Sequence, residues 1–196
     1  MAESTFSYAI LGDIGGTNAR LELTKVIKDS SKPEVVKSIF YSTQDYKGLD
    51  EVLEQFLSEF KGTDKYPTIG VIAVACPVNQ NCSEKFANCD WPPINGDETG
   101  KKFGLTSLTL LNDFEAIGHA LNKVGNDDVV VINKGKAETF GMKVVVGPGT
   151  GLGVACVGTG YNESGKVVNT VYPTEGGHTH FAATDEEEVA WGKYFL

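Results

Sequence analysis

The feature of this sequence that most constrains its fold is a pair of glycines between two short apolar runs. Residues 8–11 form one run, residues 21–24 alternate apolar with polar side chains, and Gly15 and Gly16 lie between them. This pattern predicts a β-hairpin rather than a strand-to-helix turn, because the second run has the two-residue period of a strand. Glycines in such a turn adopt positive φ readily and let another backbone or a ligand approach closely.

Polar side chains surround this turn and allow two interpretations. Asp13 ends the first apolar strand, and Thr17 and Asn18 follow the glycines. The N–H groups of the turn suit phosphate oxygens, and Asp13 suits a magnesium ion that accompanies a nucleotide and is held through water. The other interpretation is an Asp–Gly turn that serves packing alone, and this stretch by itself leaves both open.

Composition and charge narrow the class of protein. The 196 residues carry a net charge of −9, so neither nucleic acid nor an anionic membrane would meet a basic face. There is no signal peptide and no apolar run long enough to span a bilayer. The four cysteines lack CxxC spacing, and we expect them to be reduced thiols of a cytoplasmic protein.

The first part of the chain predicts an α/β layout. Three consecutive strands precede alternating helices and strands, which predicts an antiparallel meander joined to a parallel part. The apolar run at 69–76 is expected to be a central strand, because an edge strand rarely buries both faces. Strands are expected at 8–11, 21–24, 35–41, 69–76 and 108–111, a hairpin strand and loop within 78–97, and helices at 49–60, 96–104 and 114–124.

The second part begins in the same way. Strands are expected at 129–132, 142–146, 154–157 and 167–172, with a second glycine-rich turn at Gly147–Gly153. The repetition suggests two related hairpins that face one ligand and bind phosphate between them. Thr184 and Glu187 form a capping box that predicts a helix through Phe195.

These patterns predict two domains, residues 5–124 and 125–196. The last predicted helix still presents an apolar face where the sequence stops at Leu196. We therefore expect the second domain to be incomplete in this chain.

Two further polar clusters could carry chemistry. Asn112 and Asp113 lie between a strand interpreted as central and a helix, where either residue could cap the helix. At the end of a parallel strand an Asp could also accept a hydroxyl proton while the Asn orients it, and both roles can hold together. Glu175 and His178 flank two glycines, and such groups suit vicinal sugar hydroxyls. A metal site at His178 and His180 lacks an evident third ligand.

Three motifs occur in order along the chain. They are Gly12-Asp13-Ile14-Gly15-Gly16-Thr17-Asn18-Ala19-Arg20, then Leu111-Asn112-Asp113-Phe114, then Gly149-Thr150-Gly151-Leu152-Gly153 followed by Glu175-Gly176-Gly177-His178. In this order and spacing the chain resembles bacterial-type glucokinases of the actin-like (ribonuclease-H-like) ATPase superfamily. The resemblance runs from about Tyr8 to the end and implies that α/β fold, with a small domain and the incomplete start of a second.

The resemblance implies ATP-dependent phosphorylation of glucose at its 6-hydroxyl with Mg²⁺, the first step of glycolysis. Asp113 matches the general base, and Asn112, Asp113, Glu175 and His178 match sugar-binding positions. The matching ATP-binding residues are Gly12, Asp13, Ile14, Gly15, Gly16, Thr17 and Asn18 in the first phosphate loop and Gly149, Thr150 and Gly151 in the second. Asp13 is the residue implied for magnesium, and Asn88 resembles a family position close to the sugar.

Other functions stay open beside this one. The alternative is a catalytically incomplete sugar-binding module, because the resemblance covers only the front part of the family. A DNA-binding sugar regulator of the sister repressor–kinase family is disfavoured, since residues 181–188 hold no cysteine for its zinc motif and the charge is acidic. The expected partners are glucose and ATP, with no nucleic acid or membrane, and a homodimer remains among the open oligomeric states.

Overall fold

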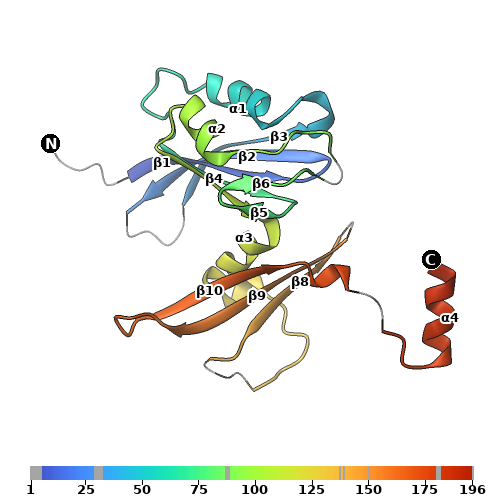
Figure 1. Ribbon diagram of the computed structural model, residues 1–196. Helices are drawn as coiled ribbons and strands as arrows, with labels where there is room; N and C mark the ends of the chain where they lie inside the picture. The colour runs from blue at the N-terminus through green and yellow to red at the C-terminus, as the bar shows by residue number, and fades with distance from the viewer. Residues whose placement is uncertain are drawn as a thin grey trace. The chain divides into compact units, whose positions relative to one another are not determined.

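The chain forms two compact units, which are described separately. The computed structural model describes residues 6–28, 33–86, 89–136, 138, 140–149, 151–179 and 182–195. The first unit is Met1–Ala116 and the second is Ile117–Leu196 (Figure 1). The division falls inside a helix, earlier than the boundary after residue 124 that the sequence pattern predicts.

The first unit is built on a five-stranded sheet of order β3-β2-β1-β4-β7. The first three strands are antiparallel to one another, whereas β4 and β7 run parallel to β1, which confirms the predicted meander joined to a parallel part. Its elements are β1 (Phe6–Ile14), β2 (Asn18–Ile27), β3 (Glu34–Ser42), α1 (Leu49–Ser58), β4 (Ile69–Val74), β5 (Val78–Asn79), β6 (Cys82–Ser83), α2 (Gly96–Lys102), β7 (Ser107–Asn112) and the start of α3 (Asp113–Ala120).

The core of the first unit lies between this sheet and the apolar face of α1. Leu53 and Phe56 of α1 are fully buried, as the helical spacing of apolar residues predicts. Gly70 allows close packing within the sheet, because a Cβ there would lie 2.5 Å from Leu108 Cδ1 and 2.7 Å from Ile10 Cγ2. Side-chain volume at these positions is therefore tightly constrained.

One prediction about the sheet is confirmed and another is wrong. β4 is an interior strand, although it ends at Val74 rather than at residue 76. β7 stands at the end of the strand order, so the strand before Asn112 is not central. The side-chain amide of Asn81 hydrogen-bonds the backbone of β7 in place of a neighbouring strand. It accepts from Leu110 N at 2.8 Å and donates to Leu108 O at 2.9 Å.

The second unit contains a three-stranded antiparallel sheet of order β10-β9-β8, which confirms the second predicted hairpin. The carboxyl-terminal part of α3 packs on this sheet, because a Cβ at Gly118 would lie 2.5 Å from Val171 Cγ1. Its elements are β8 (Lys143–Pro148), β9 (Leu152–Tyr161), β10 (Val167–Thr174) and α4 (Glu186–Phe195).

Two sequence predictions for this unit are wrong. Residues 129–132 form no strand, and their apolar side chains lie in solvent, with Val130 89% and Ile132 98% exposed. Apolar character alone cannot make a strand without a neighbour that pairs with it. The cap of α4 is shifted by one residue: Asp185 Oδ1 accepts from Glu188 N at 2.8 Å, while the Glu188 carboxylate accepts from Thr184.

Candidate active-site residues

The first candidate phosphate loop is the turn between β1 and β2. Gly15 N donates to Asn18 O at 2.9 Å, which closes the turn as predicted. Asp13 is exposed near the end of β1, whereas the Ile14 side chain is fully buried in the core. Only the backbone of Ile14 could therefore contact a ligand, and its carbonyl already accepts from Ala75 N at 3.0 Å.

Parallel strand pairing brings Asp13 and Asn112 to the same edge of the sheet. Asp13 is opposite Ala73 of β4, and the next residue of that strand, Val74, is opposite Asn112 of β7. The carboxyl ends of parallel strands are the usual location of ligand sites in α/β proteins. The first glycine turn and the Asn112–Asp113 segment thus lie at the same end of the sheet, where β1 and β7 finish.

Asp113 has the electrostatic surroundings of a proton acceptor. Burial raises the pKa of this carboxyl, and the negative charge of Asp13 raises it further, while the hydrogen bond from Phe114 N opposes both effects. That N–H donates to Asp113 Oδ1 at 2.9 Å. A carboxylate with a raised pKa binds a proton more readily than an ordinary aspartate does.

Asn112 is the residue that caps α3. Its Oδ1 accepts from Phe114 N at 3.0 Å and from Glu115 N at 3.2 Å, and its Nδ2 donates to Cys76 O at 3.4 Å. The cap is therefore Asn112, and the neighbouring Asp113 is the candidate proton acceptor. The cap also orients the backbone from which Asp113 projects.

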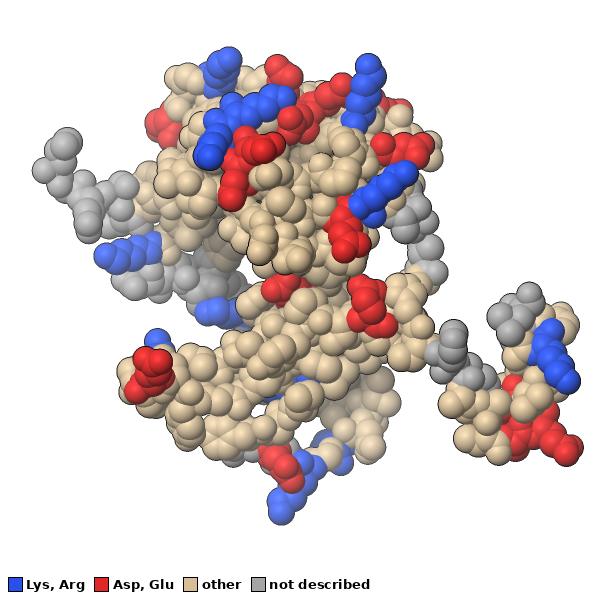
Figure 2. All heavy atoms as spheres, viewed as in Figure 1, with Lys and Arg blue, Asp and Glu red and all other residues tan. Residues whose placement is uncertain are grey.

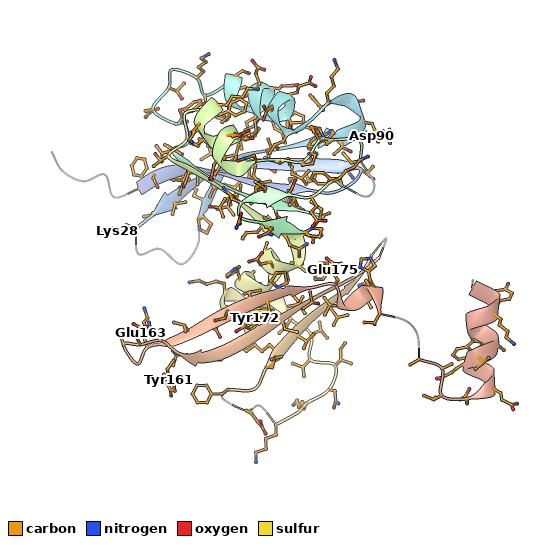
Figure 3. All side chains as sticks on the ribbon, viewed as in Figure 1. Lys28, Asp90, Tyr161, Glu163, Tyr172 and Glu175 are labelled. Atoms are coloured by element: carbon orange, nitrogen blue, oxygen red, sulfur yellow. The ribbon has the colours of Figure 1, made fainter. Side chains whose placement is uncertain are left out.

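Glu175 and His178 lie together in the second unit. A short 3-10 turn, Gly176–His178, follows β10, and His178 Nδ1 lies 2.7 Å from Glu175 Oε2. Both side chains are exposed, and Figure 3 labels Glu175 beyond the end of β10. The pair offers a carboxylate and an imidazole to solvent on one turn.

The second glycine turn lies beside this pair in the same unit. Gly149 N donates to Gly151 O at 2.8 Å across the turn between β8 and β9. A Cβ at Gly177 would lie 1.7 Å from Leu152 O, so the turn bearing His178 is pressed against the start of β9. Thr150, His180 and Asn88 lie outside the described residues.

Charged side chains of both signs are spread over the surface of the first unit (Figure 2). On the face shown in Figure 2, Lys and Arg side chains of the first unit alternate with Asp and Glu. The described residues include no group of three His, Cys, Asp or Glu side chains arranged to hold a metal ion. They also include no helix long and apolar enough to cross a membrane.

Two residues outside the sequence motifs support the first candidate phosphate loop. Thr43 and Trp91 connect this turn to the core through hydrogen bonds described below. No motif marks them, because they lie 27 and 48 residues from the groups they bond.

Comparisons with known proteins give the fold and the family. The solved glucokinase of an Antarctic psychrotroph has a TM-score of 0.74 at 27% identity, covering 94% of this chain and 55% of that one. The glucokinase of Balamuthia mandrillaris, solved in complex with glucose, has a TM-score of 0.65 at 18% identity, covering 100% of this chain and 55% of that one. These neighbours confirm the expected α/β actin-like ATPase fold.

Sequence relatives agree with the structural ones. Glucokinases of Yersinia enterocolitica and Cronobacter sakazakii are 35% and 36% identical over 182 residues, which cover 93% of this chain and 52% of each relative. The chain thus spans about half the length of the curated relatives it matches. The family model described as Glucokinase matches residues 10–195, and the chain therefore belongs to the glucokinase family.

Proposed function

We propose that this protein transfers the terminal phosphoryl group of ATP to the 6-hydroxyl of glucose. The observation that carries the proposal is the half-buried Asp113 carboxyl, whose pKa is raised by burial and by Asp13 at the edge where parallel strands end. Membership of the glucokinase family supports the same reaction class. We place this activity in the cytoplasm, at the first step of glycolysis.

In the proposed reaction Asp113 accepts the proton of the 6-hydroxyl as that oxygen attacks the phosphorus. A raised pKa brings the carboxylate nearer to the pH at which a general base works best. Asn112 holds the start of α3 and so keeps Asp113 in place, with one amide hydrogen left for a sugar hydroxyl. Phosphoryl transfer needs mainly such positioning, together with neutralisation of charge.

The phosphate groups are assigned to the two glycine turns. We assign them to turn N–H groups within Gly12–Asn18 in the first unit and within Gly149–Gly151 in the second. The N–H groups of Gly15 and Gly149 are excepted, because they already donate to Asn18 O and Gly151 O. The exposed Asp13 carboxylate supplies oxygen ligands of the kind that magnesium prefers, directly or through water. When bound, magnesium would neutralise phosphate charge.

Sugar hydroxyls are assigned to Glu175 and His178. If His178 Nδ1–H donates to Glu175 Oε2 across the 2.7 Å that separates them, His178 Nε2 is left as an acceptor for a hydroxyl. The second Glu175 oxygen can accept another hydroxyl at the same time. A carboxylate and an imidazole so arranged suit neighbouring hydroxyls of one sugar.

Calorimetric titration with glucose tests the sugar assignment. We expect glucose to bind this chain and the Glu175→Ala variant to lose that binding. Glu163→Ala is the matched control, because Figure 3 labels Glu163 at the opposite end of the β9–β10 hairpin. Equal binding by both variants would remove Glu175 from the sugar site.

An assay for glucose 6-phosphate separates the kinase from a second candidate, a sugar-binding module without catalysis. The second candidate rests on the chain's match to about half the length of its relatives. Glucose binding with product formation from ATP and magnesium supports the kinase. Binding without product at any ATP concentration supports the module.

A further inference from the structure

One threonine outside every recognised motif holds both carbonyl groups at the tip of the first glycine turn. Thr43 Oγ1 donates to Gly16 O at 2.8 Å, and Thr43 N donates to Thr17 O at 3.0 Å. Thr43 follows β3, so the bonds cross from the end of one strand to the turn between two others. Two bonds from one residue fix the orientation of two successive peptide groups.

Thr43 is itself fixed by a buried tryptophan. Trp91 Nε1 lies 2.9 Å from Thr43 O and 2.9 Å from Tyr46 O, so its N–H is shared between two carbonyls of one short segment. Thr43 is 3% exposed and Trp91 is 2% exposed, and Trp91 packs edge-on against Phe86. Two buried side chains, Trp91 and Thr43, thus anchor the turn to the core of the first unit.

The consequence concerns the N–H groups of the turn. A peptide group is planar with its N–H opposite its C=O. Holding the carbonyls of Gly16 and Thr17 therefore directs the N–H groups of Thr17 and Asn18 to the opposite side. Among the described residues, no acceptor is recorded for the N–H of Thr17, which belongs to the same peptide group as Gly16 O. The turn thus keeps the Thr17 N–H available as a donor while the carbonyls of Gly16 and Thr17 are occupied as acceptors.

We propose that Thr43, held by Trp91, is a positioning residue that keeps the Thr17 N–H of this turn directed at a phosphoryl oxygen. The proposal rests on the proposed function, in which this turn binds the phosphates of ATP. Preorganised donors cost no reorganisation when the anion arrives, so a loosened turn binds more weakly. Thr43 acts through the turn and does not touch the substrate.

The test compares three variants of this chain with the unchanged chain. Thr43→Val removes the hydroxyl at nearly constant volume, Thr43→Ser retains it, and Trp91→Phe removes the indole donor but keeps an aromatic ring. Two nuclear magnetic resonance readouts are taken for Gly15–Thr17: backbone order parameters, and amide shifts during titration with magnesium tripolyphosphate. Glucose affinity and circular dichroism serve as readouts of the rest of the fold.

We expect Thr43→Val to lower the order parameters of the turn from about 0.85 towards 0.6. Tripolyphosphate affinity at the turn should fall about tenfold, the effect of losing one hydrogen bond of about 1.4 kcal/mol. Thr43→Ser should behave as the unchanged chain, Trp91→Phe should reproduce the loss, and glucose affinity should stay constant in all three. This split distinguishes positioning from a general loss of structure.

Three results would overturn the proposal, and they are distinguishable from one another. Unchanged order parameters and affinity in Thr43→Val and Trp91→Phe would refute the role of Thr43 while the phosphate assignment stands. If the turn amides of the unchanged chain do not shift during titration with magnesium tripolyphosphate, the phosphate assignment itself is refuted. Equal loss in Thr43→Ser and Thr43→Val would show that the hydroxyl bond is not the cause.

Discussion

Gly177 and Leu152 are in such close contact that an ideal Cβ at position 177 would lie 1.7 Å from the Leu152 carbonyl oxygen. The backbone carbonyl cannot rotate away as a flexible side chain can. The turn that carries His178 and the strand that follows the second glycine turn are therefore locked together within the second unit. Only glycine at position 177 permits this arrangement.

Replacing Gly177 by Ala should displace the turn from β9. We expect a loss of about 1–3 kcal/mol in the free energy of unfolding, as for other overpacked sites, and at least a tenfold loss of glucose affinity. Gly160→Ala is the control. Gly160 also lies on β9, the strand that Gly177 contacts, but a Cβ at Gly160 would have no atom within 4 Å. Denaturant unfolding and calorimetry measure the two effects, and a stable Gly177→Ala variant with full affinity would contradict the prediction.

Asp113→Asn should abolish phosphoryl transfer yet stabilise the fold at neutral pH. Burial and Asp13 raise the pKa of Asp113 from its ordinary value of 3.8, so the folded chain binds this proton more tightly than the unfolded chain. The contribution of Asp113 to stability therefore falls as pH rises from about 3.8 through the raised pKa, and it stays unfavourable above that value.

Thermal unfolding between pH 3 and pH 7 measures this linkage. As pH rises through this window, the melting temperature of Asp113→Asn should increase relative to the melting temperature of the unchanged chain. Asp64→Asn, at an exposed carboxyl, serves as the control and should track the unchanged chain. A pH-independent difference between the Asp113 variant and the unchanged chain would mean that Asp113 does not titrate as described.

The edge of β7 depends on the side chain of Asn81. Its amide bonds to Leu108 O, Leu110 N and Asp97 Oδ1, and its backbone is left-handed with φ of 59°. Gln80 shares the left-handed backbone, with φ of 49°, but no hydrogen bond of its side chain is recorded among the described residues. Because the backbone strain is common to both sites, Asn81→Ala should cost about 2–4 kcal/mol more than Gln80→Ala. Urea unfolding of the two variants measures the difference, and equal costs would show that the amide bonds add nothing.

The core of the first unit depends on the buried face of α1. Leu53 is fully buried there, so Leu53→Ala should lower the free energy of unfolding by about 2–5 kcal/mol. Glu54→Ala, one residue away on the exposed face, should change it by less than about 0.5 kcal/mol. A small effect at Leu53 would mean that α1 is not part of the cooperative core.

Local sequence patterns predict most elements because the underlying physics is local. The apolar spacing of α1, the alternation in β2 and the glycines between β1 and β2 each act within a few residues, and all three elements are confirmed. The pattern fails at residues 129–132, where an apolar run finds no neighbouring strand. It also fails for β7, whose place in the sheet depends on partners far along the chain.

Three short sequence motifs identify the family, and local patterns predict most of the strands, helices and glycine turns in their order along the chain. Which polar groups meet depends on tertiary packing: strand register brings Asp13 and Asn112 to the same end of the sheet, and burial raises the pKa of Asp113. Likewise the bonds from Trp91 to Thr43, 48 residues away, have no local signature. Periodicity reports which face of an element is buried, whereas a long-range hydrogen bond depends on how separate elements pack, and no local pattern encodes that packing.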